Sequence, residues 1–427
     1  MKQKTGRKLL SFLLTLAMLV GLMPAMSLTA HADGFVASVT SSSDTTTNYA
    51  TFSDAVSAWN AAEGNATLKL LSDVTTTSSV NVKSTKTLDL NGHGIIGGGF
   101  TVIVVEDNNG DLTITDSNPN AVHGYVISAP LNDNGAGLAT VHSTKQDGDT
   151  EFKGGYITGG GKSGGGTNWS GQGGAIGVRA GKCSVTGCTL IGNQPNHGGG
   201  VNVMVSGSLS MSGTAVIGNK SEGHGGGVYN SHSSGTVTLT NCLIQYNYAE
   251  WYGGGIAVYR GSVIVDGGKI VNNASDTAGD GGGVGLWNYG IGSSLVLKGD
   301  VTIKDNKVKT TDENLSLTDA VNKTFVKIDG ALTCAEGSIG VTMATPGVFT
   351  KTSDENKEAW NDVSKFTSDN TSYAVGKNAS GQLLLSAPVT VTFDANTHGT
   401  DPDAQTVASG GVVTKPDDLT ADGRPDD

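Results

Sequence analysis

Proline, cysteine and charge are all scarce in this sequence. Nine prolines among 427 residues exclude a collagen-like repeat and a proline-rich linker. Four cysteines, with no Cys-x-x-Cys pair, are too few and too dispersed for a disulfide scaffold or a zinc site. Charged residues form only 15% of the chain, and acids outnumber bases by 39 to 27, which argues against a nucleic-acid partner. Glycine, at 64 positions, is about twice as frequent as average.

The chain opens with the order of features typical of a secretory signal peptide. Four of the first eight residues are basic, residues 9–23 form an apolar run, and Ala30-His31-Ala32 has the small-x-small pattern of a cleavage site. A membrane anchor is the alternative, but the apolar run is short and interrupted by Gly21. We therefore expect residues 1–32 to be removed and the mature chain to be exported, without a transmembrane segment. Cleavage moves the formal charge from −12 to −16, because 27 basic residues become 23 against 39 acids.

Two sequence markers recur in phase through the middle of the chain. The first is a tetrad of two glycines, a small residue and a β-branched residue, and its copies start 25 to 28 residues apart. The second is an aliphatic residue three positions before an asparagine. Independent markers that keep the same phase indicate a structural repeat rather than clustered glycine. The tetrads begin at Gly173, Gly198, Gly225, Gly253 and Gly281, and the asparagines are Asn193, Asn219, Asn247, Asn273 and Asn306.

Between the markers, apolar and polar residues alternate with the two-residue period of strands. The segment "GTVTLTNCLIQYN" places Val237, Leu239 and Ile244 on one face, and "GSLSMSGTAVIGN" repeats the pattern. Each unit is too short for a crossover helix, so the units are expected to stack as coils of a parallel β-helix, about 4.8 Å apart. Glycine would permit positive φ and close backbone approach at a shared corner. The asparagines would adopt left-handed turn conformations and form a hydrogen-bonded ladder.

These repeats resemble the GGG[IV]…IxxN repeats of the right-handed parallel β-helix (pectin-lyase-like) superfamily, as found in bacterial surface proteins. The resemblance is clearest over residues 171–306 and implies an all-β solenoid over 33–387. Residues 388–427 are similar to an internalin-type B repeat. The pieces that match are Val391-Thr392-Phe393-Asp394-Ala395-Asn396, Val413-Thr414-Lys415-Pro416 and Asp422-Gly423. The aromatic close of that repeat is absent, so we expect this module to be partial.

Both ends of the solenoid are predicted to be capped. Residues 52–62 have the pattern of an amphipathic helix with Ser53 as its N-cap, and such a helix would cover the exposed edge of the first coil. Residues 354–366 are predicted to be helical as well. The segment from Tyr373 to Ser386 is predicted to form a closing strand pair.

Metal binding and thiol chemistry receive weak support. Asp107-Asn108-Asn109-Gly110-Asp111 is spaced like the start of a calcium loop but lacks the later ligands, so a surface turn is preferred and calcium stays open. Cys183 falls in an inward position of its strand. Cys188 and Cys242 occupy the same position two coils apart, too far for a disulfide, and buried thiols are expected. No cofactor is predicted.

Catalysis remains an alternative because the resemblance implies it. Many members of the superfamily are polysaccharide lyases or glycoside hydrolases that use carboxylates on neighbouring coils. Here the acids of the repeat region are not expected to form one stacked row, and no residue can be assigned a catalytic role. These acids are Glu222, Glu250, Asp266, Asp276 and Asp280.

The most informative positions flank the glycine tetrads. Stacking of the coils would bring His197 near His224, and would bring Trp251 and Tyr252 near Tyr259 or Trp287. Exposed aromatic rings among amides and hydroxyls suit stacking against sugars, so the preferred function is a non-catalytic adhesin that binds glycans or a host surface as a monomer. Ordinary turn variation is the competing interpretation, and zinc at the histidine pair lacks further ligands. The candidate ligand-binding residues are His197, His224, Trp251, Tyr252, Tyr259 and Trp287.

Overall fold

The computed structural model describes most of the chain beyond the predicted signal peptide, which lies outside the described residues. Two compact units are distinguished, residues 1–35 and 36–427, and the account below concerns the second. Among the residues described, no helix is long and apolar enough to cross a membrane. The described ranges are 34–130, 134–162, 172–277, 281–287, 293–317, 324–351, 360–394 and 401–413.

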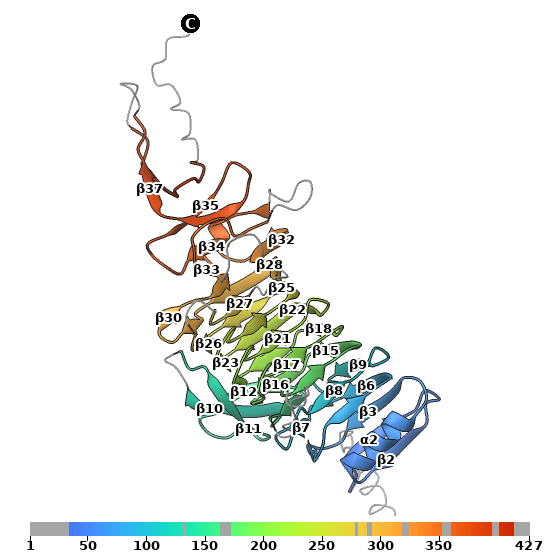
Figure 1. Cartoon of the computed structure of the whole chain (residues 1–427). Coiled ribbons are helices and arrows are strands. Elements are labelled where there is room, and N and C mark those ends of the chain that lie inside the picture. Colours follow the sequence, from blue (N-terminus) through green and yellow to red (C-terminus); the bar gives the residue numbers. More distant parts are fainter. Residues whose placement is uncertain are drawn as a thin grey trace, which may run out of the picture. The chain divides into compact units, whose positions relative to one another are not determined.

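Three columns of parallel strands run through the second unit (Figure 1), because each coil adds one short strand to each column. Strands of one column pair in register, as in the row Leu209, Val237 and Val263. The predicted parallel β-helix is confirmed. Column 1 contains β3 (Ala66–Leu70), β6 (Thr85–Asp89), β9 (Asp111–Thr115), β15 (Lys182–Thr186), β18 (Ser208–Ser212), the first parts of β22 (Thr236–Gln245), β25 (Gly261–Val271) and β28 (Ser293–Lys304), and β32 (Thr324–Leu332).

Columns 2 and 3 complete each coil. Column 2 contains β4 (Val74–Thr75), β7 (Gly94–Ile96), β13 (Tyr156–Thr158), β16 (Thr189–Ile191), β19 (Ala215–Ile217), the second parts of β22, β25 and β28, the start of β33 (Ile339–Met343), and β34 (Phe366–Ser368). Column 3 contains β5 (Val80–Val82), β8 (Ile103–Val105), β14 (Ile176–Val178), β17 (Val201–Val203), β21 (Val228–Asn230), β24 (Ile256–Val258), β27 (Val284–Leu286), β31 (Leu315–Leu317) and the end of β33.

The core lies inside the coils and is built from the alternating residues that the sequence predicts. Leu209, Val237 and Ile244 each expose about 1% of their surface. Cys183 occupies the same inward row as Leu209, and Cys188 and Cys242 are buried, so these thiols behave as core residues. Burying one aliphatic side chain of this size contributes about 2 kcal/mol, and each coil adds several.

The five repeat asparagines form a buried ladder that joins successive coils. The backbone N–H and the Nδ2 of Asn219 both donate to Oδ1 of Asn247, at 3.0 and 2.9 Å, and the pattern repeats along the stack. After Asn306 the ladder continues through Asn314 and ends on the carboxylate of Asp369. The predicted ladder is confirmed. The predicted left-handed conformation is wrong for the asparagines themselves, since it falls one residue earlier, at Gly192, Gly218, Tyr246, Asn272 and Asp305.

The first two glycines of each tetrad meet different structural requirements. The first glycine of every copy has positive φ, between 61° and 86°, which L side chains rarely adopt. The second glycine lies against the next coil: a methyl group at Gly226 would overlap the carbonyl oxygen of Gly254.

Between column 2 and the tetrads, four two-residue strands pair in parallel, and β30 (Thr311–Asp312) pairs antiparallel with the last of them. The four are β20 (Lys220–Ser221), β23 (Tyr248–Ala249), β26 (Ala274–Ser275) and β29 (Lys307–Val308).

A helix caps the first coil, as predicted, and a hairpin that was not predicted lies beside it. Helix α2 (Phe52–Ala61) buries Phe52, Ala55 and Trp59, and β1 (Ala37–Thr40) pairs antiparallel with both β2 (Thr46–Tyr49) and β3. The predicted N-cap Ser53 is wrong by two positions. Thr51 accepts the N–H of Asp54 with its hydroxyl, because the helix begins at Phe52, earlier than the sequence indicated.

The C-terminal prediction is confirmed in part. Residues 354–359 of the expected helix lie outside the described residues. Its described remainder contains 3-10 turns, including η2 (Val363–Lys365), and no α-helix, because Phe366 already starts a strand that pairs with column 2. The closing strand pair is present as β35 (Ala374–Lys377) and β36 (Leu383–Ser386). A second hairpin, β37 (Pro388–Val391) and β38 (Gln405–Ala408), follows within the same unit. The boundary at residue 388 stays a prediction.

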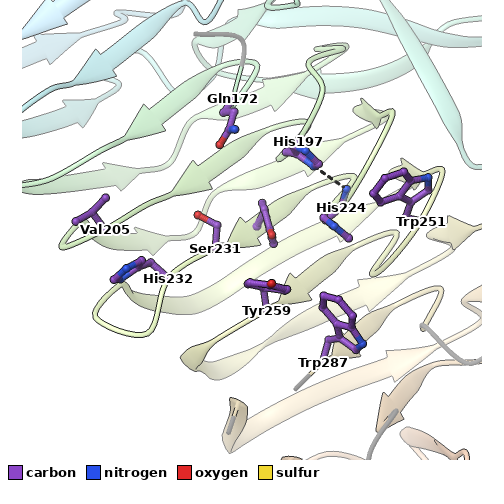
Figure 2. Close-up of a pocket in the computed structure, with 10 residues that line it drawn as sticks. Gln172, His197, Val205, His224, Ser231, His232, Trp251, Tyr259 and Trp287 are labelled. Atoms are coloured by element: carbon purple, nitrogen blue, oxygen red, sulfur yellow. Dashed lines mark hydrogen bonds between the residues drawn. The ribbon is translucent and has the colours of Figure 1, made fainter. Parts of the chain in front are cut away.

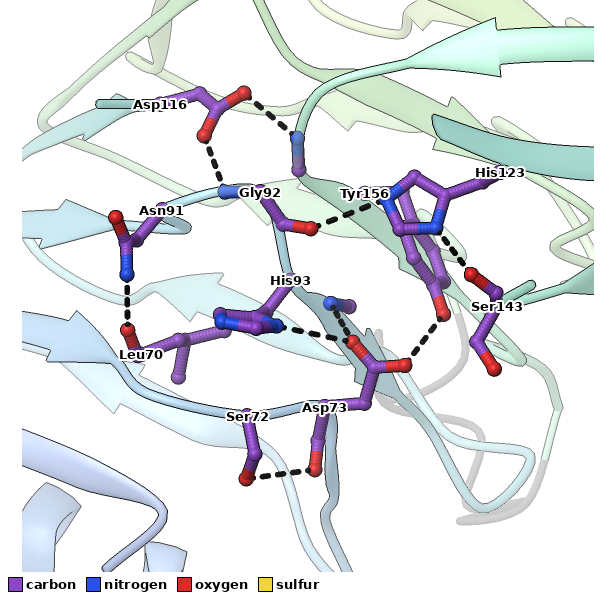
Figure 3. A network of polar contacts seen from close by, with 12 residues as sticks. Leu70, Ser72, Asp73, Asn91, Gly92, His93, Asp116, His123, Ser143 and Tyr156 are labelled. Carbon is purple, nitrogen blue, oxygen red and sulfur yellow. Dashed lines mark hydrogen bonds and ion pairs between the residues drawn. The ribbon is translucent and has the colours of Figure 1, made fainter. Parts of the chain in front are cut away.

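An antiparallel sheet that the sequence did not reveal is inserted between β9 and β13. Its strands, in the order β11 (Gly137–His142), β10 (Val122–Pro130) and β12 (Thr150–Lys153), cover the outer face of column 2. Polar contacts fasten it to the coils (Figure 3). Nε2 of His123 lies 3.0 Å from the carbonyl oxygen of Gly92, and Asp116 accepts the backbone N–H groups of Gly92 and Gly155. Within the coils beneath this sheet, Tyr156 of β13 donates its hydroxyl to Asp73 at 3.3 Å.

Candidate functional site

A groove of about 370 Å³ lies on the outer face of column 3, above strands β17, β21 and β24 (Figure 2). Tyr229, the central residue of β21, is the aromatic residue of its floor. Of the six residues predicted to bind a ligand, Tyr252 does not line the groove, and its ring stacks on that of His224. The five predicted residues that line the groove are His197, His224, Trp251, Tyr259 and Trp287.

Two rows of side chains border the groove because every coil turns at the same two places. One row precedes the glycine tetrads and holds Gln172, His197, His224 and Tyr252. The other row follows the column 3 strands and holds Ser231, Tyr259 and Trp287. In-register pairing of the strands places equivalent residues of a row on neighbouring coils, so the repeat itself aligns these rings.

The rings of His197, His224 and Tyr252 stack on successive coils, and the ring of Trp287 packs beside the last two, 6.1 Å from that of His224. The ring centroids of His197 and His224 are 5.2 Å apart with planes 13° from parallel. His224 and Tyr252 are 4.7 Å apart at 16°, and Tyr252 and Trp287 are 4.8 Å apart at 19°. These separations match the strand spacing of about 4.8 Å. The predicted neighbours His197–His224 and Tyr252–Trp287 are therefore brought together.

Trp251 lies differently from the prediction. Its indole packs edge-on against His224, with centroids 5.2 Å apart and planes at 75°, instead of joining Tyr259 or Trp287. The rings of Tyr259 and Trp287 pack on each other, with centroids 4.9 Å apart, and Trp251 is not part of this contact. The reason is that Trp251 precedes the stacked position by one residue, so its side chain leaves the stack. As a result Trp251 is 52% exposed and offers an open ring at the groove.

The two histidines are held as neutral rings. The backbone N–H of His224 donates to Nδ1 of His197 at 3.2 Å, which leaves the proton of that imidazole on Nε2. This contact requires Gly223, because a methyl group there would overlap the His197 ring. Burial lowers the pKa of both histidines, and the neighbouring His197 adds to the effect on His224, whose pKa falls to about 4.

The histidine stack predicts a loss of stability in acid. Below about pH 6.5 the unfolded chain protonates His224, whereas the folded protein resists until about pH 4, so unfolding is favoured as the pH falls through this window. Allowing for partial solvent screening, we expect wild type to lose about 1–2 kcal/mol more than the His224→Phe variant between pH 7 and pH 4.5. Urea unfolding of both proteins at a series of pH values measures the difference, and two parallel curves would contradict the prediction.

The described acids do not form one row, as predicted, because Asp266 lies apart, but three of them do share a row. Glu222, Glu250 and Asp276 do stack on successive coils, because each follows a strand residue of the paired row Ser221, Ala249 and Ser275. Sequence reasoning missed this row because its strands are two residues long. Lys162 pairs with Glu222, and Lys220 pairs with Glu250 at 3.2 Å. Asp266 lies apart in column 1, with Lys298 2.9 Å away. Asp280 lies outside the described residues.

No metal site emerges from the described part of the chain. The carboxylate of Asp107 accepts the backbone N–H groups of Asn109 and Gly110, so the segment that resembles a calcium loop forms a self-capped turn. Among the described residues, no group of three His, Cys, Asp or Glu side chains is placed to hold a metal ion. Nδ1 of His197 already serves as a hydrogen-bond acceptor.

Comparisons with known proteins give no identification. No protein-family model, no curated protein and no solved structure matches this chain. The chemistry of the groove must therefore be inferred from its own residues.

The sequence missed several residues of the groove. Tyr229 could have been found, because it is the central residue of a strand whose flanking valine and asparagine point inward. Val205 and His232 lie in turns of unequal length between columns 3 and 1, and unequal turns carry no repeat signal. Ser231 belongs to the row of Tyr259 and Trp287. Gln172 is in the same row as His197, with which it forms a parallel bridge.

Proposed function

We propose that this chain is an exported, surface-associated β-helix protein that binds glycans through the aromatic groove, without catalysis. The observation that carries the proposal is the open indole of Trp251 at the mouth of a groove built on stacked rings. Sites for small molecules are concave, mostly apolar and supplied with a few fixed polar groups, which describes this groove. Binding of this kind would suit an adhesin that engages glycans or a host surface.

The chemistry of the lining supports a sugar over other ligands. A sugar ring presents an apolar face of C–H groups and an edge of hydroxyls. The indoles of Trp251 and Trp287 can contact such a face, whereas Gln172, Ser231 and the neutral imidazoles can exchange hydrogen bonds with the edge. No lining residue among those described is acidic, lysine or arginine, so a nucleic acid or another strongly charged ligand finds no partner charge.

Alanine at Trp251 or Trp287 is expected to weaken glycan binding at least tenfold, because large aromatic anchors carry a disproportionate share of binding energy. Trp251→Ala should leave the thermal stability close to wild type, since half of its side chain is exposed. A glycan array and isothermal titration with the best ligand measure the effect. Phe325→Ala, which removes a partly exposed aromatic ring from column 1, is the matched control. Full binding by Trp251→Ala would refute the groove as the site.

Glycoside hydrolysis is the second candidate, and the stacked row of Glu222 and Glu250 beside the groove favours it. Equivalent residues on neighbouring coils lie about 4.8 Å apart, which is close to the separation of about 5 Å between the two carboxyl groups of retaining hydrolases. Incubating the protein with a panel of polysaccharides, with and without calcium, distinguishes the two functions. New reducing ends or unsaturated products that disappear in Glu250→Gln would establish catalysis, whereas retention without products supports the binder.

A further inference from the structure

Val205 is an unusual residue at the edge of the groove. Its φ is +32°, in the left-handed region, and half of its side chain is exposed. A β-branched residue in this region is strained, at about 1–3 kcal/mol, because its Cβ crowds the backbone. It is the only β-branched member of the described non-glycine residues with positive φ, which also include five Asn or Asp residues.

Backbone geometry does not account for this valine. The turns between columns 3 and 1 on two other coils place glycine at their left-handed position, Gly181 and Gly261, each with φ of +77° and each in register with Gly207 of this coil. Val205 lies two positions before Gly207, in a turn that is one residue longer than that of Gly181, and takes the left-handed conformation without being glycine. Glycine at residue 205 would remove the strain, and it would leave no apolar side chain exposed to water. The side chain of Val205 therefore stays strained and exposed where it lines the groove (Figure 2). Strain that persists beside a cavity points to a role in ligand contact.

Two polar groups of the next coil lie at the same end of the groove. The hydroxyl of Ser231 donates to the carbonyl oxygen of Val203 at 2.9 Å, so its oxygen can accept a further hydrogen bond. Nδ1 of His232 accepts the backbone N–H of Ser234 at 3.3 Å, so the neutral imidazole carries its proton on Nε2 and can donate. Val205, Ser231 and His232 thus present a methyl surface, an acceptor and a donor to one end of the groove.

We propose that Val205, Ser231 and His232 form a subsite for the acetamido group of an N-acetylated, uncharged sugar. The methyl group of the acetamide packs on Val205, its N–H donates to Oγ of Ser231, and its carbonyl oxygen accepts from Nε2 of His232. The sugar ring is then free to extend over the groove toward Trp251 and Trp287. This inference rests on the proposed glycan-binding function and adds the class of sugar that the groove selects.

The test compares two soluble oligosaccharides that share one backbone. Tetra-N-acetylchitotetraose carries acetamido groups at the positions where cellotetraose carries hydroxyls, and neither is charged. Isothermal titration of the mature protein is expected to give at least tenfold tighter binding of the acetylated ligand, because a hydroxyl leaves the donor and the methyl surface unmatched. Val205→Gly, which relaxes the turn, should reduce the ratio of the two affinities at least threefold. His232→Ala should reduce it by a similar factor.

Val205→Gly should also raise the melting temperature, which shows that its loss of preference does not come from unfolding. Val389→Gly, at an exposed valine of β37 far along the sequence from the groove, is the matched control and should keep the full ratio. Equal affinity of wild type for both oligosaccharides would overturn the acetamido subsite while supporting glycan binding. A preference that survives in both Val205→Gly and His232→Ala would place the selectivity elsewhere. No binding of either ligand, or of any glycan on an array, would instead overturn the proposed function.

Discussion

Asn247→Ala is expected to destabilise the central coils by about 3–6 kcal/mol. Oδ1 of Asn247 accepts the backbone N–H and the Nδ2 of Asn219, and its own Nδ2 donates to the carbonyl oxygen of Val216 at 2.8 Å and to Oδ1 of Asn273 at 2.9 Å. All three asparagines are fully buried. Alanine leaves both donors of Asn219 without that acceptor in a site without access to water, and each buried unsatisfied group costs about 1–3 kcal/mol.

Urea unfolding followed by circular dichroism measures this loss, and hydrogen exchange locates it in β22 and β25. Asn81→Ala is the control, because Asn81 lies on a column 3 strand with its side chain exposed, and it should change stability by less than about 0.5 kcal/mol. Equal stabilities of the two variants would show that the ladder does not hold the coils together. Because coils unfold as linked neighbours, the variant is also expected to lose glycan binding when β21 and β24 separate.

The ladder shows what the repeat could and could not reveal. In-phase spacing of Asn219 and Asn247 was sufficient to predict both the stacking of coils and the hydrogen bonds between them, since equivalent residues must be neighbours in a β-helix. The same spacing could not show which residue takes the left-handed conformation. Positive φ falls on Gly218 and Asn272, residue types that tolerate the left-handed conformation, but also on Tyr246, which does so rarely. Intrinsic preference therefore agrees with the conformation on most coils, and at Tyr246 the ladder bonds of the following asparagine hold it.

The candidate site also contains residues whose positions the repeat predicts and residues whose positions it does not. His197, His224 and Tyr252 occupy one row of the repeat, so their stacking follows from register alone. Trp251 stands one residue outside that row, and its direction depends on a side-chain rotamer that no repeat encodes. Val205 lies in a turn whose length differs from those of the neighbouring coils, and the antiparallel sheet from Val122 to Lys153 interrupts the repeat altogether. The register of neighbouring coils can be predicted from a repeat in the sequence. Side-chain rotamers and the packing of inserted segments cannot, because they depend on contacts that form only in the folded chain.

Gly226→Ala is expected to prevent the corner from closing, at about 4 kcal/mol or more. The φ of Gly226 is not positive, so its conformation is open to any residue and the requirement for glycine is one of space. A methyl group at Gly226 would overlap the carbonyl oxygen of Gly254 and lie 2.6 Å from the backbone nitrogen of Tyr248. Backbone atoms cannot rotate away as a side chain can, so two neighbouring coils would have to separate.

Gly213→Ala separates the two roles of glycine in this fold. Gly213 has φ of +55°, and no atom lies within 4 Å of the place that a methyl group would take, so alanine there incurs only the left-handed strain of about 1 kcal/mol. Thermal unfolding of both variants should therefore place Gly213→Ala near wild type and Gly226→Ala far below it. Comparable losses would mean that conformation, not contact between coils, dictates glycine at the tetrads. Because the tetrad follows His224 directly, a corner that cannot close also displaces the histidine stack, so glycan binding should fail in Gly226→Ala and persist in Gly213→Ala.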